Sequence, residues 1–426
     1  MTTVPREWTV ESVRELADRK FGKRACLFQI EVALALYAKK DIVACAPTGA
    51  GKTLSFWLPL LMAQEEGLKR ITIVVTPLNL LGKQNAEELG KAGIRAVAIS
   101  RETASPKLWK EVEQGHYQVV IINPELLLGS AEAKALWRNS HFTAWILNII
   151  FDEGHCISQW GKFRKEYSQL GSLRYLIPAA IPFYVASATL PKSVLIDIAN
   201  VLRLRPEQTE YIMRSNEQPE IALSVRSFVY PANTFKDLLF LLPGEPYCET
   251  IPWKFIIFFN NIKESESAAL MMRKRLRPGN QQRLVYFHST MTPAYREEKV
   301  RCFREGSVVG LFATDAFGMG MDLADIAVIV QFKSTCDLNS LFQRFGQAAR
   351  GCDQSAVAIL LVDKKDTDES RMKSQQAAQK RKEKKLKGTV SPGHPSCLRH
   401  GHTIWLSPLQ TQTHANLLRP LQPRCL

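Results

Sequence analysis

Short apolar runs alternate with segments of helical period along most of the chain. The apolar runs of the first half are residues 41–45, 71–76, 96–100, 118–122, 146–151 and 183–186, and those of the second half are residues 254–259, 283–288, 308–313, 326–331 and 356–362. Helical segments lie between them, among them residues 53–63, 80–91, 265–276 and 295–305. Strands that alternate with helices predict a mostly parallel sheet with helices on both faces, so the fold class is α/β.

A polar stretch near residues 205–219 separates the two series. The sequence therefore predicts two α/β domains, residues 1–205 and 206–365. The remaining segment, residues 366–426, is different, because residues 371–387 hold eight Lys or Arg and one acid. Such a composition is typical of a disordered basic tail, for which nuclear import and non-specific contact with phosphates are the functional alternatives.

The composition of the 426 residues, 46% hydrophobic and 23% charged, is ordinary for a soluble globular protein. Without an apolar run of 18 residues or an amino-terminal signal, we expect neither a membrane span nor secretion. The nine cysteines form no C-x-x-C pair, which favours a reduced intracellular protein that binds no zinc. The net charge is +15, and the residues from Lys364 onward, 13 basic and 4 acidic, contribute +9 of it, so charge alone does not identify a nucleic-acid partner.

A candidate phosphate-binding loop (P-loop) lies at residues 46–53, with the sequence APTGAGKT. It follows the apolar run 41–45 and precedes the helical segment 53–63, the context that this motif requires. Glycines let backbone N–H groups close round phosphates, Lys52 reaches the β- and γ-phosphates, and the Thr53 hydroxyl reaches a metal ion. The first position is Ala46 where the strict pattern has glycine. The candidate nucleotide ligands are Thr48, Gly49, Ala50, Gly51, Lys52 and Thr53.

Two adjacent acids, Asp152 and Glu153, follow the apolar run 146–151 directly. In an open parallel sheet, ligands bind at the carboxyl ends of the strands, where these acids are expected. There Asp152 is suited to hold Mg²⁺, Glu153 to orient a water molecule, and His155 to respond to both.

Several short elements follow one another in a set order: Gln29, then residues 46–53 (APTGAGKT), 76–78 (TPL), 123–125 (NPE), 152–155 (DEGH), 187–189 (SAT), 313–322 (ATDAFGMGMD) and 343–350 (QRFGQAAR). Over roughly residues 20–362 this order resembles a superfamily 2 helicase core. Residues 152–161 (DEGHCISQWG), the following Phe163, Arg164 and Tyr167, and the AFGMG stretch resemble the RecQ-like DNA helicases more narrowly.

The resemblance implies two tandem RecA-like domains that use ATP and Mg²⁺. It implies that Gln29 reads the adenine, that Gly320 and Asp322 face the nucleotide, and that Arg350 acts as an arginine finger beside the catalytic Lys52, Asp152 and Glu153. The residues that it assigns to nucleic-acid contact or to coupling are Thr76, Pro77, His155, Trp160, Phe163, Ser187, Thr189 and Thr314. The alternatives are a surface position for Gln29, core positions for Trp160 and Phe163, and capping roles for Thr314 and Asp322.

Three departures from the family pattern leave the activity open. Gln347 stands where the family has the first of two arginines, the loop after Trp160 is one residue short with Lys162 in place of a His-Asp pair, and nothing after residue 362 resembles a zinc module or winged helix. The leading hypothesis is an ATP-dependent 3′–5′ DNA helicase that acts on single-stranded and partly duplex DNA in repair or recombination. The alternatives are an ATP-binding nucleic-acid clamp with little turnover and an RNA helicase. A nuclear location is expected, with the cytoplasm as the alternative, and the oligomeric state stays open.

Overall fold

The computed structural model describes residues 6–368 apart from residues 78, 162, 163, 179, 245, 246, 316, 318–322, 324 and 351–353, together with residues 370, 372, 373 and 376. Met1–Thr367 form one compact unit that contains two parallel sheets. The tail predicted from residue 366 falls almost entirely outside the described residues.

The first sheet has seven strands in the order β3-β4-β2-β5-β6-β1-β7, and all of its strand pairs are parallel. Its strands are β1 (Asp41–Cys45), β2 (Ile71–Val75), β3 (Ala96–Ile99), β4 (Val119–Ile122), β5 (Ile146–Phe151), β6 (Phe183–Ser187) and β7 (Thr209–Met213). Strands β1, β2, β4, β5 and β6 are buried along their whole length, because helices cover both faces of the sheet. This double burial explains why they read as continuous apolar runs in the sequence.

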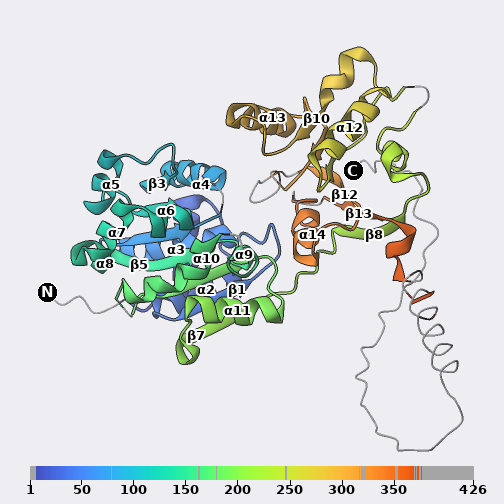
Figure 1. The fold of residues 1–426 in the computed structure, drawn as a ribbon. Helices are drawn as coiled ribbons and strands as arrows, with labels where there is room; N and C mark the ends of the chain where they lie inside the picture. Colours follow the sequence, from blue (N-terminus) through green and yellow to red (C-terminus); the bar gives the residue numbers. More distant parts are fainter. Residues whose placement is uncertain are drawn as a thin grey trace, which may run out of the picture. The chain divides into compact units, whose positions relative to one another are not determined.

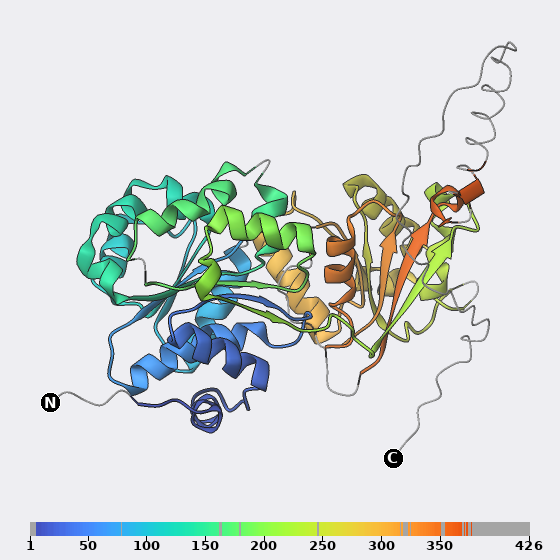
Figure 2. The same cartoon turned by 90° about the horizontal axis from the view of Figure 1, so that it is seen from below.

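The helices of this first lobe divide between the two faces of the sheet. They are α1 (Val10–Phe21), α2 (Leu27–Tyr37), α3 (Lys52–Glu65), α4 (Asn79–Lys91), α5 (Pro106–Glu113), α6 (Pro124–Gly129), α7 (Ala131–Arg138), α8 (Ser140–Trp145), α9 (His155–Trp160), α10 (Lys165–Gln169) and α11 (Lys192–Leu202). Core residues of α1–α4 pack with Ile42 and Ala44 of β1, whereas those of α5–α11 pack with Val43 and Cys45. The alternating side chains of one strand therefore supply two cores. Figures 1 and 2 show the helices on the two faces of this sheet.

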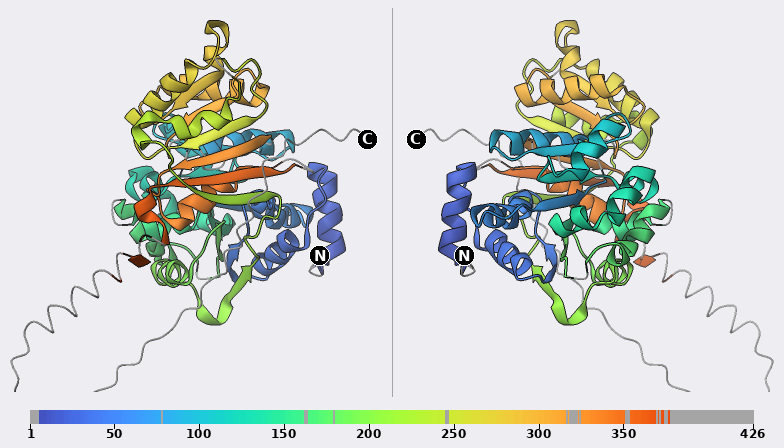
Figure 3. Two further views of the ribbon diagram at one scale, coloured as in Figure 1. Left: turned by 90° about the vertical axis from the view of Figure 1, so that its right-hand side faces the viewer. Right: turned by 90° about the vertical axis from the view of Figure 1, so that its left-hand side faces the viewer.

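The second sheet has six parallel strands in the order β10-β11-β9-β12-β13-β8. Its elements are β8 (Ile221–Ser227), β9 (Lys254–Phe258), α12 (Ile262–Arg273), β10 (Leu284–Phe287), α13 (Pro293–Glu305), β11 (Gly310–Ala313), β12 (Ile326–Phe332), α14 (Leu338–Phe345) and β13 (Ala356–Val362). Helix α12 covers one face, and α13 and α14 cover the other. Figure 3 shows β13 (orange-red) and β8 (yellow-green) at one edge of this second lobe.

The predicted fold class, two mostly parallel sheets flanked by helices, is confirmed, and the predicted strands agree with the structure to within one or two residues. Strands β7 and β8 were absent from the predicted series. Both lie at sheet edges and carry exposed side chains, so neither forms an apolar run. Because β7 belongs to the first sheet, that sheet extends past residue 205, and residues 214–220 connect the lobes. No helix within the described part of the chain is long and apolar enough to span a bilayer.

Asp41, the first residue of β1, is a fully buried carboxylate that bonds residues around the amino-terminal end of this strand. It accepts hydrogen bonds from Arg174 Nη2 at 2.6 Å, Arg205 Nη2 at 2.9 Å and the Phe183 backbone at 2.8 Å. Burial raises the pKa of Asp41, but the hydrogen bonds from Arg205 and Arg174 outweigh it, so the pKa lies below its ordinary value. The ionised carboxylate therefore stabilises the fold above the pKa of an unfolded Asp.

Replacing this carboxylate tests its contribution. Asp41→Asn should lower the free energy of unfolding at pH 7 by about 3–5 kcal/mol, because it removes the negative charge that balances two partly buried guanidinium groups. The difference from the wild type should shrink as the pH falls toward the lowered pKa of Asp41, where the wild-type carboxyl also becomes neutral. Chemical denaturation at several pH values measures both effects. Asp197→Asn, at an exposed position of α11, is the matched control; an equal loss in both variants would contradict the assignment.

Candidate active site

The P-loop forms the tight turn between β1 and α3. Gly49 and Gly51 have φ angles of 85° and 72°, in the left-handed region that glycine adopts without strain. A Cβ at Gly51 would also lie 2.5 Å from Gln29 Nε2, so this position excludes larger residues twice over. The turn leads into the amino terminus of α3, whose free N–H groups favour anions.

Lys52, the first residue of α3, folds back onto the turn. Its Nζ donates to the carbonyl oxygens of Ala46 at 2.9 Å and Pro47 at 3.0 Å. Burial lowers the pKa of Lys52, and the neighbouring carboxyl groups of Glu153 and Asp152 oppose this shift. The ammonium group therefore lies between the loop and the two acids, where a phosphate could replace the carbonyls as its partner. Thr53 follows it in the first turn of α3.

The acids occupy a strained turn at the end of β5. The backbone N–H of Asp152 donates to Val75 O at 2.9 Å, which continues the β5–β2 ladder by one residue. Glu153 has a φ of 50°, a left-handed conformation that costs a non-glycine residue about 1–3 kcal/mol. A Cβ at Gly154 would lie 2.3 Å from Val185 Cγ1, so the next residue must be glycine. Strain of this kind is typical of functional sites.

The charges at this turn fit a divalent cation. Burial and the neighbouring Glu153 raise the pKa of Asp152 to about 7, while Lys52 opposes the rise. Glu153 Oε2 is buried without a hydrogen-bond partner within the described residues. A hard cation would reverse the rise in pKa by favouring the ionised carboxylate. The described residues contain no group of three or more His, Cys, Asp or Glu placed to hold a metal ion, so an ion here would take further ligands from water or phosphate, as is typical of Mg²⁺.

The three residues predicted to couple the site to nucleic acid lie together at the end of β6. His155 Nδ1 and Ser187 Oγ are 2.9 Å apart, and the Thr189 backbone N–H donates to the same hydroxyl at 3.2 Å. His155 Nδ1 also lies 3.5 Å from Glu153 Oε2. Burial lowers the pKa of His155, which favours the neutral ring. A chain of polar contacts therefore connects Glu153 with the turn after β6.

Helix α14 of the second lobe and the residues after it reach this same site. Gln343 Nε2 donates to Glu153 Oε1 at 3.1 Å. A Cβ at Gly346 would lie 2.6 Å from Thr48 Oγ1 of the P-loop. Arg350 contributes to lowering the pKa of Lys52, so its guanidinium group acts at the same place. Arg350 was predicted for this position from the sequence, whereas Gln343 and Gly346 were quoted only as parts of a motif.

Arg344, the residue after Gln343, contacts residues of its own lobe instead of Glu153. The sequence analysis assigned it no role. Its buried guanidinium group donates to Asp315 and Gln331, and to Asn260 Oδ1 at 3.4 Å. These partners lie at or just beyond the carboxyl ends of β11, β12 and β9. Thr314, predicted to contact nucleic acid, lies beside Asp315 after β11. Arg344 therefore fastens α14 to the loops on which Thr314 lies.

Most of the other residues predicted from the sequence lie within the described structure. Gln29 is buried, which rules out a surface position, and its amide bonds Gly51 O and the Cys26 N–H, each at 2.8 Å. Thr76 and Pro77 are buried at the carboxyl end of β2. Trp160 is half-buried, with Tyr167 edge-on at 5.6 Å between ring centroids and the Arg164 guanidinium 4.6 Å from its ring. Phe163, Gly320 and Asp322 lie outside the described residues.

Two protein families match this chain. The DEAD/DEAH box helicase family matches residues 27–198, and the helicase conserved C-terminal domain matches residues 233–352. A solved structure titled as the DEAD-box helicase Mss116 bound to ssRNA and UDP-BeF aligns over 85% of this chain and 77% of that chain, with a TM-score of 0.66 and 19% identity. This likeness shows the fold, and the two families cover more than half of the chain. The chain therefore carries a two-lobed helicase core.

Proteins of similar sequence indicate which helicases this chain resembles. The ATP-dependent DNA helicase RecQ of Pasteurella multocida is 29% identical over 346 residues, which are 79% of this chain and 50% of that protein. The ATP-dependent helicase SGS1 of Saccharomyces cerevisiae is 27% identical over 331 residues, 76% of this chain and 22% of that protein. The chain thus carries a helicase core that is similar to those of RecQ-family DNA helicases, and it spans half or less of the length of these two relatives.

The contact between Gly346 and the P-loop gives a steric test. Gly346 has a φ of −68°, which alanine adopts freely, so Gly346→Ala adds the clash with Thr48 Oγ1 and a tight approach to Gln218 Oε1 at 3.1 Å, without backbone strain. Overpacking of this size costs about 1–3 kcal/mol, and we expect ATP turnover to fall by about five- to 100-fold. Steady-state ATP hydrolysis measures this, and thermal unfolding checks that the fold is retained.

Gly129→Ala is the control for this substitution, because nothing lies within 4 Å of the added Cβ. Its turnover should match the wild type. Undiminished turnover in Gly346→Ala would show that α14 and the P-loop separate before hydrolysis.

Proposed function

We propose that this chain is an ATP-dependent DNA helicase or translocase of the RecQ type. The observation that carries the proposal is the 3.1 Å hydrogen bond from Gln343 of the second lobe to Glu153 of the first. This bond joins Glu153, the residue best placed to orient an attacking water, to helix α14. Arg344, the residue after Gln343 in α14, bonds residues at or beyond the carboxyl ends of β9, β11 and β12. Hydrolysis of ATP and binding of nucleic acid then both depend on helix α14.

In this proposal the P-loop and the amino terminus of α3 bind the ATP phosphates, and Lys52 exchanges its two carbonyl partners for phosphate oxygens. Asp152 and Thr53 hold Mg²⁺, which supplies positive charge to the transferring phosphoryl group when it is bound. Glu153 orients the attacking water, and Arg350 neutralises charge in the transition state. Gln29, Gly320 and Asp322 are assigned to the base and the ribose.

On the nucleic-acid side, Thr76, Pro77 and Thr314 are assigned to the DNA backbone and Trp160 and Phe163 to stacking on bases. His155, Ser187 and Thr189 pass the nucleotide state to that side. Movement in the 3′–5′ direction on single-stranded DNA, a role in repair or recombination and a nuclear location belong to the same proposal. They are supported by the resemblance to RecQ-like enzymes and, for location, by the basic run at residues 371–387.

A second candidate function is an ATP-binding clamp that hydrolyses ATP slowly. Gln347 favours it, because this neutral side chain is only 2% exposed at the position where the family pattern has an arginine. Glutamine can donate a hydrogen bond to a phosphate but cannot neutralise it. The transition state then relies on Lys52, Arg350 and the metal ion for its positive charge.

ATP hydrolysis with and without single-stranded DNA separates these functions. If the chain is an active helicase, DNA should stimulate turnover strongly in the wild type, and Lys52→Ala should abolish it. If the chain is a clamp, wild-type turnover should be low, and Gln347→Arg should raise it by on the order of 10²–10³. Stimulation by RNA alone would contradict the DNA assignment. Turnover that survives in Lys52→Ala would contradict the assignment of the P-loop.

A further inference from the structure

The segment that connects the lobes, residues 214–220, is bonded to Cys45, the last residue of β1, and to Thr48 of the P-loop. The Arg214 backbone N–H donates to Cys45 O at 2.8 Å, and Cys45 Sγ lies 3.8 Å from Asn216 Oδ1. Gln218 Nε2 donates to Thr48 O at 3.3 Å. The connector therefore follows the chain from the last residue of β1 into the phosphate-binding turn.

Gln218 also contacts the second lobe. Its Oε1 would lie 3.1 Å from a Cβ at Gly346, and its backbone carbonyl accepts the Ile221 N–H, at the start of β8, at 3.0 Å. The P-loop, the connector and the end of α14 thus meet at this one side chain. Its side-chain N–H group bonds the carbonyl of Thr48, and its backbone carbonyl bonds the first residue of β8.

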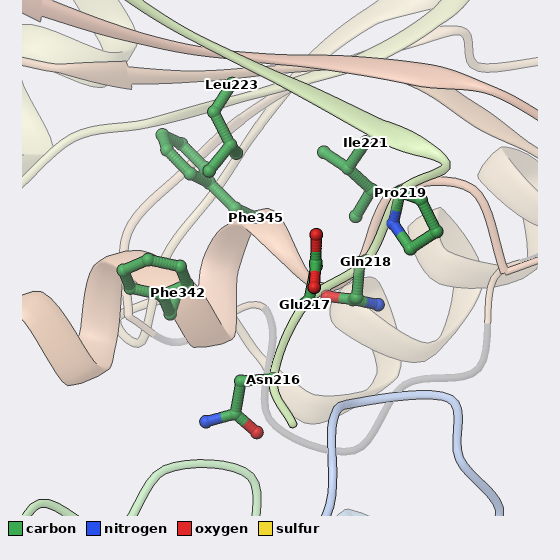
Figure 4. Close-up of a pocket in the computed structure, with 8 residues that line it drawn as sticks. All are labelled: Asn216, Glu217, Gln218, Pro219, Ile221, Leu223, Phe342 and Phe345. Carbon is green, nitrogen blue, oxygen red and sulfur yellow. The ribbon is translucent and has the colours of Figure 1, made fainter. Parts of the chain in front are cut away.

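A pocket of about 470 Å³ separates the connector from α14. Figure 4 shows Phe342 and Phe345 of α14 on one side of it and Gln218 and Pro219 of the connector on the other. Because this space is not filled by side chains, the distance between α14 and the connector can change without disrupting a packed core. The connector is therefore hydrogen-bonded to the P-loop, whereas a space separates most of it from helix α14.

We infer that Gln218 is a positioning residue that transmits the occupancy of the P-loop to the connector between the lobes. The inference rests on the proposed use of ATP. Without nucleotide, three consecutive P-loop carbonyls have side-chain donors: Lys52 serves those of Ala46 and Pro47, and Gln218 serves that of Thr48. A phosphate that takes Lys52 away leaves Gln218 as the side-chain donor to the Thr48 carbonyl and Gln29 as the side-chain donor to the Gly51 carbonyl. Any rearrangement of the turn then moves the connector through one hydrogen bond.

Gln218→Ala tests this by removing the donor. Hydrogen–deuterium exchange of the full chain, with and without AMP-PNP and Mg²⁺, compares a peptide from the P-loop with a peptide that covers residues 214–227. In the wild type the nucleotide should change exchange in both peptides. In Gln218→Ala the P-loop response should persist while the connector response falls by about three- to ten-fold, the range expected for one hydrogen bond.

Two further variants separate the hydrogen bond from packing. Gln218→Glu keeps the size of the side chain but removes the donor, so it should behave like Gln218→Ala. Glu217→Gln, at the exposed neighbouring position, should behave like the wild type. In ATP hydrolysis stimulated by DNA, Gln218→Ala should lower kcat by about three- to ten-fold and leave KM for ATP within about two-fold.

The outcomes distinguish the inference from the proposed function. A wild-type P-loop that does not respond to AMP-PNP would overturn the proposed function and the inference with it. A P-loop that responds while the connector response is equal in the wild type and Gln218→Ala would overturn the inference alone. A connector response lost in both donor-free variants and kept in Glu217→Gln supports it.

Discussion

The site depends on one constraint, the tight turn that ends β5. Glu153 has a left-handed conformation, and the next residue, Gly154, has no room for a side chain against Val185. This backbone geometry directs the Glu153 carboxylate toward His155 on one side and Gln343 on the other. An extended backbone at the same place would send the side chain elsewhere. The strain of about 1–3 kcal/mol thus fixes the meeting point of both lobes.

Helix α14 contacts both lobes through two neighbouring side chains. Gln343 and Arg344 are consecutive residues, so their side chains leave the helix about 100° apart. Gln343 contacts the acid of the first lobe, whereas Arg344 fastens the helix to Asp315 and Asn260 in the second. A displacement of α14 relative to its own sheet would therefore change both sets of contacts. This arrangement can couple hydrolysis to nucleic acid without any motion inside the sheets.

The fold was predictable because fully buried parallel strands must be apolar on both faces. The P-loop and the Asp152–Glu153 pair were predictable because each follows such a strand. Edge strands β7 and β8 were not, since exposed side chains interrupt their pattern. Gln218, Gly346 and Arg344 were missed for a different reason. Their importance comes from contacts with residues distant in sequence. Arg344 and Gly346 lie within the motif at residues 343–350, which assigns them no role, and Gln218 lies outside every motif.

Gln347 gains a physical meaning from this arrangement. The site holds two acids, Lys52 and Arg350, and burial lowers the pKa of Lys52, with Arg350 adding to the effect. A further arginine at the buried position 347 would lose its hydration and repel these two cations whenever no phosphate is present. Glutamine avoids both costs, so it favours the contact between the lobes in the absence of nucleotide. The same neutrality withholds a positive charge from the transition state. Under the proposed function, glutamine at this position would therefore favour association of the lobes over turnover.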